Sequence, residues 1–387
     1  CPPTEAGRRA LSASPKNSDP ERAAVRAAER DAFAAAAGWG DAAVEAFPGD
    51  ASTRAYFRLR KSGSETAILM DAPSAAEAPH APDEADEAER ARLGYNALAR
   101  LAGNNVAAFA GLAEALTARG FSAPRILAGD GDRGLLLIED LGDGVFARLV
   151  PEHAHEGALY AAAVDTLAAL YRSSPPDAVS YQGAHWRIHP LDAAAQRAEA
   201  RLFLDWYAAH QAGLAPDEAA AAQFDALWTD IAPAFEAHAP GLALRDYHAE
   251  NLIWLPEREH HARVGLLDYQ DAVFAHPAYD LVSLLEDARR DVDPELAPAL
   301  KARFFERAGL SDREAFDAAY ALAGAQRNAK ILGIFVRLAR RDHKPRYLAM
   351  IPRVARHFVR DLSHPAAAEI RRWCEDCAPF VFEEARR

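Results

Sequence analysis

The spacing of apolar residues divides the chain into a first part rich in strands and a second part rich in helices. In the first part, a helix is predicted to begin at Asp19 and Pro20, where a capping residue precedes a favourable first helical position. Short segments that alternate or run apolar then follow, separated by turn signals, at 43–47, 54–60 and 66–70. These three segments predict an antiparallel meander.

A second hairpin is predicted further along the same part. A helix with apolar residues every three to four positions ends near Gly120, and strand-like segments at 124–128 and 135–139 flank the turn GDGDRG. The stretch 75–92, rich in Ala, Glu and Asp, is interpreted as a solvated helix face or a mobile insert. The first part is therefore expected to be mostly sheet, with a helix across it.

The second part is predicted to be mainly helical. Long alanine-rich segments carry apolar residues at helical spacing, at 157–171, 191–212 and 217–238. One strong interruption, LALRDYHAENLIWL followed by VGLLDYQDAVF, contains strand-like pieces with polar residues between them. We predict an α+β, two-lobed fold with a flexible segment 1–18, a sheet-rich N-lobe 19–141 and a helical C-lobe 142–387.

Composition narrows the class of protein. The length of 387 residues exceeds the ~250–300 at which single cores stop growing, which favours two lobes. No apolar run approaches the ~18–20 residues that a membrane span needs, and a formal net charge of −13 argues against a nucleic-acid surface. Three cysteines are too few for a disulfide framework, so we expect a cytoplasmic protein, with a monomer favoured.

The interruption in the helical part carries the candidate chemistry. Asp246 and Asn251 stand five positions apart on an expected loop, and Asp268 ends the apolar run VGLL. Phosphoryl transfer needs a carboxylate that positions the attacking hydroxyl, together with oxygen ligands for Mg²⁺. Asn251 and Asp268 can supply the metal ligands, which leaves Asp246 as the base. The segment therefore predicts an ATP-dependent small-molecule kinase.

These motifs resemble those of the aminoglycoside phosphotransferase and choline kinase family, which has the protein-kinase architecture. The similar segments are GDASTRAYFRL, LLLIEDLG, RDYHAEN, LLDYQD and HPAYDLVSLLEDARRD. Within that family, the wording MDAP, LLLIEDLG, LDYQDA and LLEDARRDV most resembles kinases that phosphorylate N-acetylmuramate and N-acetylglucosamine at C1. The resemblance covers about residues 40–300 and implies ATP, Mg²⁺ and a small sugar as the partners.

The resemblance also implies supporting roles for several positions. The backbone around Glu139 and Leu141 corresponds to the family's adenine anchor. His248 is expected to brace the loop backbone, and Asp280 resembles a buried carboxylate at a helix start that holds the catalytic loop. These assignments are expectations carried from the family.

The sequence departs from the kinase pattern on the third strand. Kinases normally place a lysine there for the α- and β-phosphates, whereas TAILMDAP has Met70 at that place. Arg54 or Arg58 could replace it, and we rank Arg54 first because Ser52 and Thr53, in the expected phosphate loop, precede it. The alternative, weighed about evenly, is that both arginines simply lie along a sheet surface.

The candidate substrate contacts lie on the third strand and in the helical part of the chain. Asp71 could meet the sugar or metal, or could simply initiate a turn. Glu199 and Trp206 share one helix face and could hydrogen-bond and stack on a sugar, although such stripes are more often core. Arg290 could pair with an acceptor carboxylate such as a lactyl group, or form a surface pair with Glu286.

Two other functions stay open at this point. The acidic balance of the chain would suit a kinase of a cationic acceptor of the choline or aminoglycoside type. A non-catalytic nucleotide-binding module would explain Met70, although the intact set of Asp246, Asn251 and Asp268 counts against it.

Overall fold

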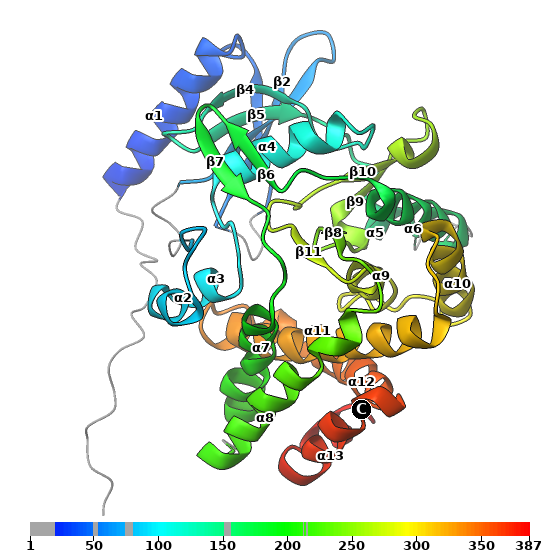
Figure 1. Ribbon diagram of the computed structural model, residues 1–387. Coiled ribbons are helices and arrows are strands. Elements are labelled where there is room, and N and C mark those ends of the chain that lie inside the picture. The colour runs from blue at the N-terminus through cyan, green and yellow to red at the C-terminus, as the bar shows by residue number, and fades with distance from the viewer. Residues whose placement is uncertain (1–19, 49–52, 74–79, 151–155, 212, 214–215) are drawn as a thin grey trace, which may run out of the picture.

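A computed structural model describes residues 20–48, 53–73, 80–150, 156–211, 213 and 216–387. The chain forms an antiparallel sheet at one end and a mainly helical part at the other (Figure 1). The resulting class is the α+β class that the apolar pattern predicted. Among the described helices, none combines the length and the apolar character needed to cross a membrane.

The sheet contains five strands in the order β1-β2-β3-β5-β4, and every neighbouring pair is antiparallel. The strands are β1 (Ala43–Ala46), β2 (Ala55–Arg60), β3 (Thr66–Asp71), β4 (Ile126–Asp130) and β5 (Leu135–Glu139). The predicted meander and the second hairpin are therefore confirmed, with boundaries that differ by at most two residues. Segment 75–92 contains only the short helix α2 (Glu87–Leu93) among its described residues.

The two faces of this sheet have different partners. On the outer face, Leu59 and Leu69 pack with Ala34 of α1 (Pro20–Ala36), which begins where the capping signal predicted. On the inner face, Tyr56 and Met70 are register partners and pack toward α4 (Val106–Thr117). Because strand residues alternate between faces, this register decides which side chains can reach the catalytic loop.

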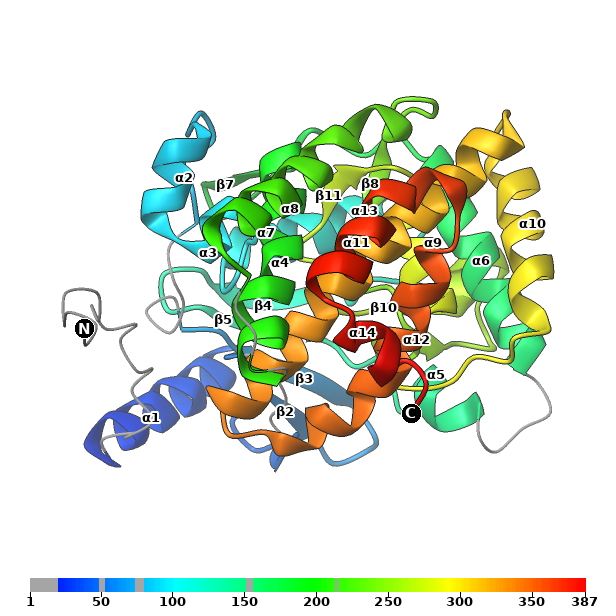
Figure 2. The same cartoon turned by 90° about the horizontal axis from the view of Figure 1, so that it is seen from below.

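The helical part is organised around α11 (Arg313–Arg340), which packs against several other helices. Figure 2 shows α12, α13 and α14 on the side of α11 away from the sheet. A core rich in aromatic residues, including Phe203, Trp228 and Phe358, joins these elements. The remaining α-helices are α3 (Tyr95–Leu98), α5 (Phe146–Leu149), α6 (Glu156–Arg172), α7 (Ala193–Leu202), α8 (Glu218–Asp230), α9 (Ala278–Leu285), α10 (Leu296–Ala308), α12 (Ile351–Asp361), α13 (Ala368–Cys377) and α14 (Phe380–Glu384).

Two features of the helical part differ from the predicted pattern. The segment 191–212 continues from α7 into a π-helix, Phe203–Gln211. A hairpin of β6 (Ala178–Tyr181) and β7 (Ala184–Arg187) was not predicted, because each strand has only four residues and the periodic signal is short. This hairpin packs on α4, beside the sheet (Figure 1).

Elements from each side of the predicted boundary at 141–142 pack on elements from the other side. The β6–β7 hairpin comes from the second part of the chain but packs on α4, and α3 from the first part packs on α7. Arg90 of α2 also forms an ion pair with Asp192, with 2.9 Å between Nη1 and Oδ2. The two parts therefore share packing surfaces, although they follow each other in sequence.

Candidate active site

The loop that carries Asp246 lies between two short strands, each of which pairs with a strand from the segment that carries Asp268. β8 (Gly241–Ala243) pairs with β11 (Val273–Ala275), and β9 (Leu252–Trp254) pairs with β10 (Val264–Leu266). The backbone N–H of Leu267 donates to the carbonyl of Asn251 at 3.0 Å. This pairing places Asn251 next to the residue that precedes Asp268.

Asn251 and Asp268 present side-chain oxygen atoms that could bind a cation. Asn251 Nδ2 donates to the backbone carbonyl of Asp246 at 3.0 Å, which leaves its Oδ1 as an acceptor. The Asp268 side chain is 42% exposed, and its backbone adopts a φ of 55°. An amide oxygen and an accessible carboxylate match the donors that Mg²⁺ prefers, with nucleotide phosphates completing its shell.

The described residues contain no cluster of three or more His, Cys, Asp or Glu that could hold a metal ion. Asn251 and Asp268 supply one amide oxygen and one carboxylate, and the remaining ligands of a bound Mg²⁺ would come from nucleotide phosphates and water.

Arg54 provides a positive charge beside Asp268. Its Nη1 lies 3.1 Å from Asp268 Oδ1, and its Nη2 donates to the Gly103 carbonyl at 3.3 Å. Arg54 precedes β2 on the inner face, whereas Met70 is 1% exposed and belongs to the hydrophobic core. The guanidinium thus lies where a cation can meet both a phosphate and the metal ligand.

Arg58 has a different set of partners. Its Nε lies 2.7 Å from Asp140 Oδ2, and its Nη1 lies 2.8 Å from Asp143 Oδ1. Both carboxylates follow β5, at the connection between the sheet and the helical part. Arg58 therefore stabilises this connection, and neither arginine simply lies along the sheet surface.

The other residues expected to contact the nucleotide differ in their surroundings. Ser52 lies outside the described residues, while Thr53 Oγ1 lies 3.2 Å from Asn104 Oδ1. The Glu139 carboxylate pairs with Arg258 at 2.8 Å, and Leu141 is buried in a small apolar cluster. The adenine anchor therefore stays a prediction about backbone groups.

Asp280 contacts the catalytic loop in the way the family resemblance implied, whereas among the described residues the His248 ring meets the side chains of Arg289 and Asn251 and not the loop backbone that it was expected to brace. The Asp280 carboxylate accepts the backbone N–H of Arg245 at 2.9 Å and that of Leu244. His248 Nε2 lies 3.1 Å from Arg289 Nη1, and because arginine only donates, this nitrogen must accept. Burial, followed by Arg289, lowers the pKa of His248 to about 4, so the imidazole is neutral near pH 7.

Glu199 is a correction to the predicted substrate contacts. Its side chain has no exposed surface and accepts from Arg245, from Lys330 Nζ at 2.7 Å and from Gln326 Nε2 at 3.1 Å. An acceptor cannot reach a carboxylate enclosed in this way. Glu199 instead anchors Arg245, the neighbour of Asp246, to the helical core.

Asp71 is a second correction, because it lies on the outer face of the sheet. Arg26 Nη2 lies 2.6 Å from its Oδ1, and Arg30 Nη1 lies 2.9 Å from its Oδ2. Both arginines belong to α1, and the Asp71 side chain is only 5% exposed. Asp71 therefore attaches α1 to the sheet rather than facing the sugar or the metal.

Neither Trp206 nor Arg290 contacts the catalytic loop. Trp206 is half-buried on the π-helix, with its ring 5.1 Å from that of His210. Arg290 Nη1 lies 2.8 Å from Glu156 Oε1 and donates to the Tyr160 hydroxyl at 2.6 Å, both on α6. The alternative pair with Glu286 is also wrong, because Glu286 pairs with Arg360.

The sequence interpretation missed three cations around Asp246. Burial favours the neutral acid, but the positive charges of Lys330, Arg327 and Arg289 outweigh it and lower the pKa of Asp246. Arg327 and Lys330 come from α11, far along the chain, and no local motif pointed to them. Asp246 is therefore ionised near pH 7, as a proton acceptor must be.

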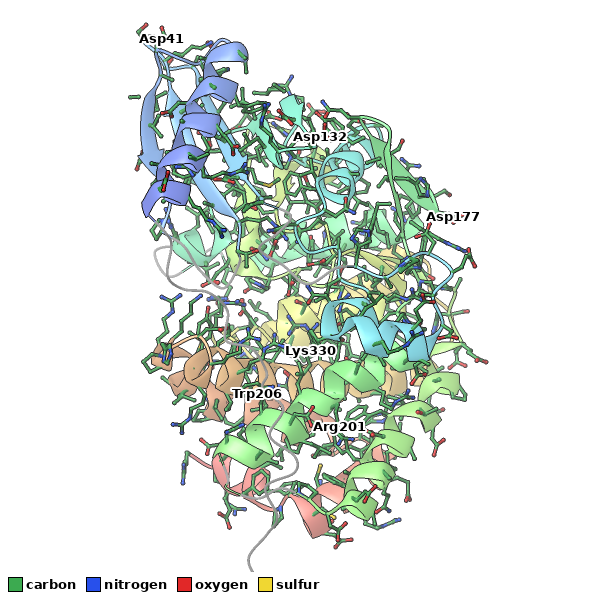
Figure 3. All side chains as sticks on the ribbon, turned by 90° about the vertical axis from the view of Figure 1, so that its left-hand side faces the viewer. Asp41, Asp132, Asp177, Arg201, Trp206 and Lys330 are labelled. Carbon is green, nitrogen blue, oxygen red and sulfur yellow. The ribbon has the colours of Figure 1, made fainter. Side chains whose placement is uncertain are left out.

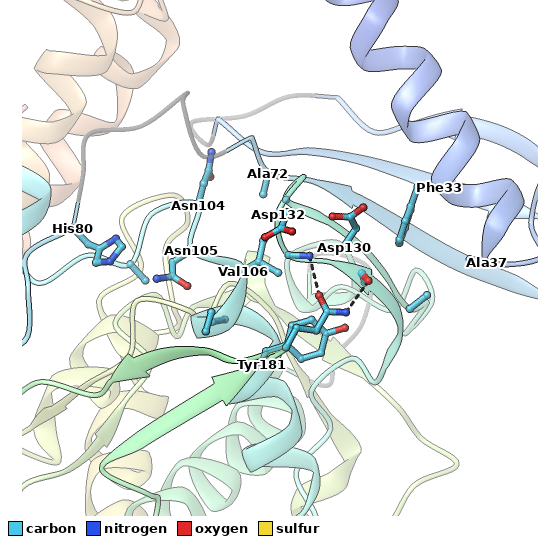
Figure 4. A pocket seen from close by; sticks show the side chains of 18 of the residues that line it. Phe33, Ala37, Ala72, His80, Asn104, Asn105, Val106, Asp130, Asp132 and Tyr181 are labelled. Carbon is cyan, nitrogen blue, oxygen red and sulfur yellow. Dashed lines mark hydrogen bonds between the residues drawn. The ribbon is translucent and has the colours of Figure 1, made fainter.

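A large cavity lies outside this constellation. It has a volume of about 890 Å³ and lies between α1, the start of α4 and the β4–β5 and β6–β7 hairpins (Figure 4). Asn104, which bonds Thr53, is on its wall, but neither Asp246 nor Asp268 lines it. Its polar wall includes His80, Asn105, Asp130, Asp132, Tyr181 and Gln182.

The fold and the site together define a phosphotransferase of the protein-kinase-like class. The chain belongs to the phosphotransferase enzyme family known by the letters APH, whose family model matches residues 43–319. Among curated proteins, an N-acetylmuramate/N-acetylglucosamine kinase from Caulobacter vibrioides is 46% identical over 94% of this chain and 98% of its own. A kinase of the same name from Pseudomonas aeruginosa is 31% identical over 87% of this chain and 89% of its own.

Solved structures support the fold. A choline kinase from Streptococcus pneumoniae aligns with a TM-score of 0.52 at 12% identity, covering 86% of this chain and 99% of that protein. A GDP complex of an aminoglycoside 2'-phosphotransferase aligns with a TM-score of 0.50 at 12% identity, covering 82% and 93%. These likenesses confirm the predicted two-lobed architecture.

Proposed function

We propose that this chain is an ATP-dependent kinase that transfers phosphate to the C1 hydroxyl of N-acetylmuramate, N-acetylglucosamine or both. The observation that carries the proposal is the arrangement of ionised Asp246 beside the oxygen pair of Asn251 and Asp268. The curated relatives named as kinases of these two sugars support the choice of acceptor. Because the reaction consumes ATP, the cytoplasm is the proposed location, and we propose a monomer.

Each residue of the site has a role in this proposal. Asp246 accepts the proton of the C1 hydroxyl, whose oxygen forms a bond to the γ-phosphorus as the bond between that phosphorus and the β–γ bridging oxygen breaks. ADP leaves with the bridging oxygen, and the sugar leaves as its 1-phosphate. Arg54 would contact the phosphates, and Asn251 and Asp268 would hold Mg²⁺, which would neutralise charge on them.

The charges around Asp246 argue against a cationic acceptor. Lys330, Arg327 and Arg289 surround the carboxylate that must meet the acceptor, and a choline-like or aminoglycoside cation would be repelled there. A non-catalytic module is also less favoured, because Arg54 supplies the charge that Met70 lacks. An uncharged or anionic acceptor fits the site best.

An ATP-consumption screen tests the proposal. Purified protein with Mg²⁺ is assayed with N-acetylglucosamine, N-acetylmuramate, choline and an aminoglycoside, and the 1-O-methyl glycosides of both sugars serve as blocked controls. We expect turnover with at least one free sugar and none with its methyl glycoside. Turnover of the blocked glycosides at the same rate would exclude transfer to C1.

A further inference from the structure

One face of α11 carries positive charge from the neighbourhood of Asp246 toward the end of the helix. Lys330, Ile334, Arg337 and Arg341 follow one another at intervals of three or four residues, so they share that face. Lys330, Ile334 and Arg337 are half-buried, whereas Arg341 is exposed. In Figure 3, Lys330 lies closer to the sheet than Trp206 and Arg201 do.

Lys330 is the second of two cations that pair with Glu199. Glu199 already has the fully buried guanidinium of Arg245 as a counter-ion, and Lys330 Nζ is a second cation at 2.7 Å from the same carboxylate. The Lys330 side chain keeps 13% of its surface exposed, whereas Glu199 has none. Part of the Lys330 side chain therefore remains accessible at the edge of this buried group.

Arg337 has no acidic partner among the described residues. Its guanidinium carbon lies 5.1 Å from the ring centroid of Tyr95 on α3, and its Nε is buried without a hydrogen-bond acceptor. Burial lowers the pKa of this arginine despite the nearby charges of Tyr95 and Asp342, because desolvation of the cation costs free energy. An anionic ligand would remove that cost.

The local charge contrasts with that of the whole chain. Between residues 326 and 346 there are seven Lys and Arg residues and one acidic residue, Asp342, in a chain whose net charge is −13. This excess of positive charge beside the site favours an anion over a cation as ligand.

We propose that Lys330 and Arg337, together with Tyr95, form an acceptor subsite that binds a carboxylate. This inference rests on the proposed function and deepens it, because N-acetylmuramate carries a lactyl carboxylate and N-acetylglucosamine does not. The two cations are ~10 Å apart along the helix axis, from the rise per residue, which suits a substituted sugar. The C1 hydroxyl would lie at the Asp246 end and the lactyl group toward Arg337, so the subsite favours N-acetylmuramate.

Steady-state kinetics with both sugars test this assignment. Arg337→Met should raise the KM for N-acetylmuramate by about tenfold or more, the loss expected for a hydrogen bond to a charged group, and leave the KM for N-acetylglucosamine within about twofold. Arg337→Lys should recover part of the loss. Lys330→Met keeps Arg245 as the counter-ion of Glu199 but removes a cation that acts on Asp246, so kcat should fall with both sugars, and only the ratio of the two KM values tests the subsite.

Arg313→Met is the matched control, because it removes a cation from the same helix at ~25 Å from Lys330 along the axis. Thermal unfolding shows whether each variant is folded, and Arg337→Lys and Lys330→Met carry the test if Arg337→Met is not. Equal increases in the KM values for both sugars, or no increase for either, overturn the subsite while the kinase function stands. A wild-type protein that phosphorylates neither sugar overturns both proposals.

Discussion

Arg54 Nη1 lies 3.1 Å from Asp268 Oδ1, so the start of β2 is joined to the loop that follows β10. Arg54 is 9% exposed, and its second contact is to the Gly103 carbonyl, just before α4. This side chain connects three segments that are distant in sequence. It also brings a permanent positive charge to the carboxylate assigned to the metal, which is where the phosphates of a nucleotide would be bound.

Replacement of Arg54 tests its role as the substitute for the missing lysine. Arg54→Met should reduce kcat/KM for ATP by about tenfold to a hundredfold, because the variant loses a charge-assisted contact to phosphate. Arg54→Lys should retain part of the activity. Arg60→Met on the same strand is the control, since Arg60 is exposed and pairs only weakly with Glu45. Unchanged ATP kinetics in Arg54→Met would exclude the phosphate contact.

Asp246→Asn tests the base. The amide cannot accept the hydroxyl proton, so kcat should fall by about a hundredfold to ten-thousandfold, while the dissociation constant for ATP changes little. Calorimetric titration with ATP and Mg²⁺ measures the second quantity. A variant with comparable turnover would remove Asp246 from the mechanism.

Asp71→Asn tests whether Asp71 holds α1 on the sheet, as observed, or contacts the sugar, as the sequence predicted. The variant loses the charge that holds Arg26 and Arg30, and the free energy of unfolding should fall by about 2 kcal/mol. The KM values for both sugars should stay unchanged, because Asp71 lies on the outer face. Urea denaturation measures the first effect. A raised sugar KM with unchanged stability would contradict the structural assignment.

Acid should destabilise the protein through its buried histidines. Burial, followed by His238, lowers the pKa of His276 to about 3, whereas an unfolded histidine titrates near ~6.5. The unfolded state therefore binds more protons as pH falls from 6.5 toward 3, so this part of the stability is complete above 6.5 and lost below it.

His276→Phe should flatten the dependence of unfolding free energy on pH by up to ~1.4 kcal/mol per pH unit within that window, the contribution of one proton. Denaturant titrations between pH 7 and pH 5 measure the slope. The same substitution at the exposed His185 is the control. An identical slope in His276→Phe and the wild type would show that this histidine does not titrate differently on folding.

The candidate site was predictable where its residues are close in sequence. The loop RDYHAEN and the Asp268 segment contain the proposed base and both proposed oxygen ligands, and local strand pairing brings the two segments together. A kinase normally has a lysine at the position of Met70. The sequence left Arg54 and Arg58 as candidates to supply the missing charge, with Arg54 ranked first. Only the structure showed that Arg58 pairs with Asp140, while Arg54 pairs with Asp268.

The sequence by itself determined the class of fold, the five strands of the N-terminal sheet and the residue types of the catalytic loop, but not the β6–β7 hairpin. These follow from apolar periodicity and from residue types at short spacing, which are local properties. The tertiary structure alone decided that Asp71 faces α1, that Glu199 is enclosed and that Lys330 lies beside the catalytic loop. Such features depend on which faces pack together, and packing between distant segments leaves no periodic signal in either segment.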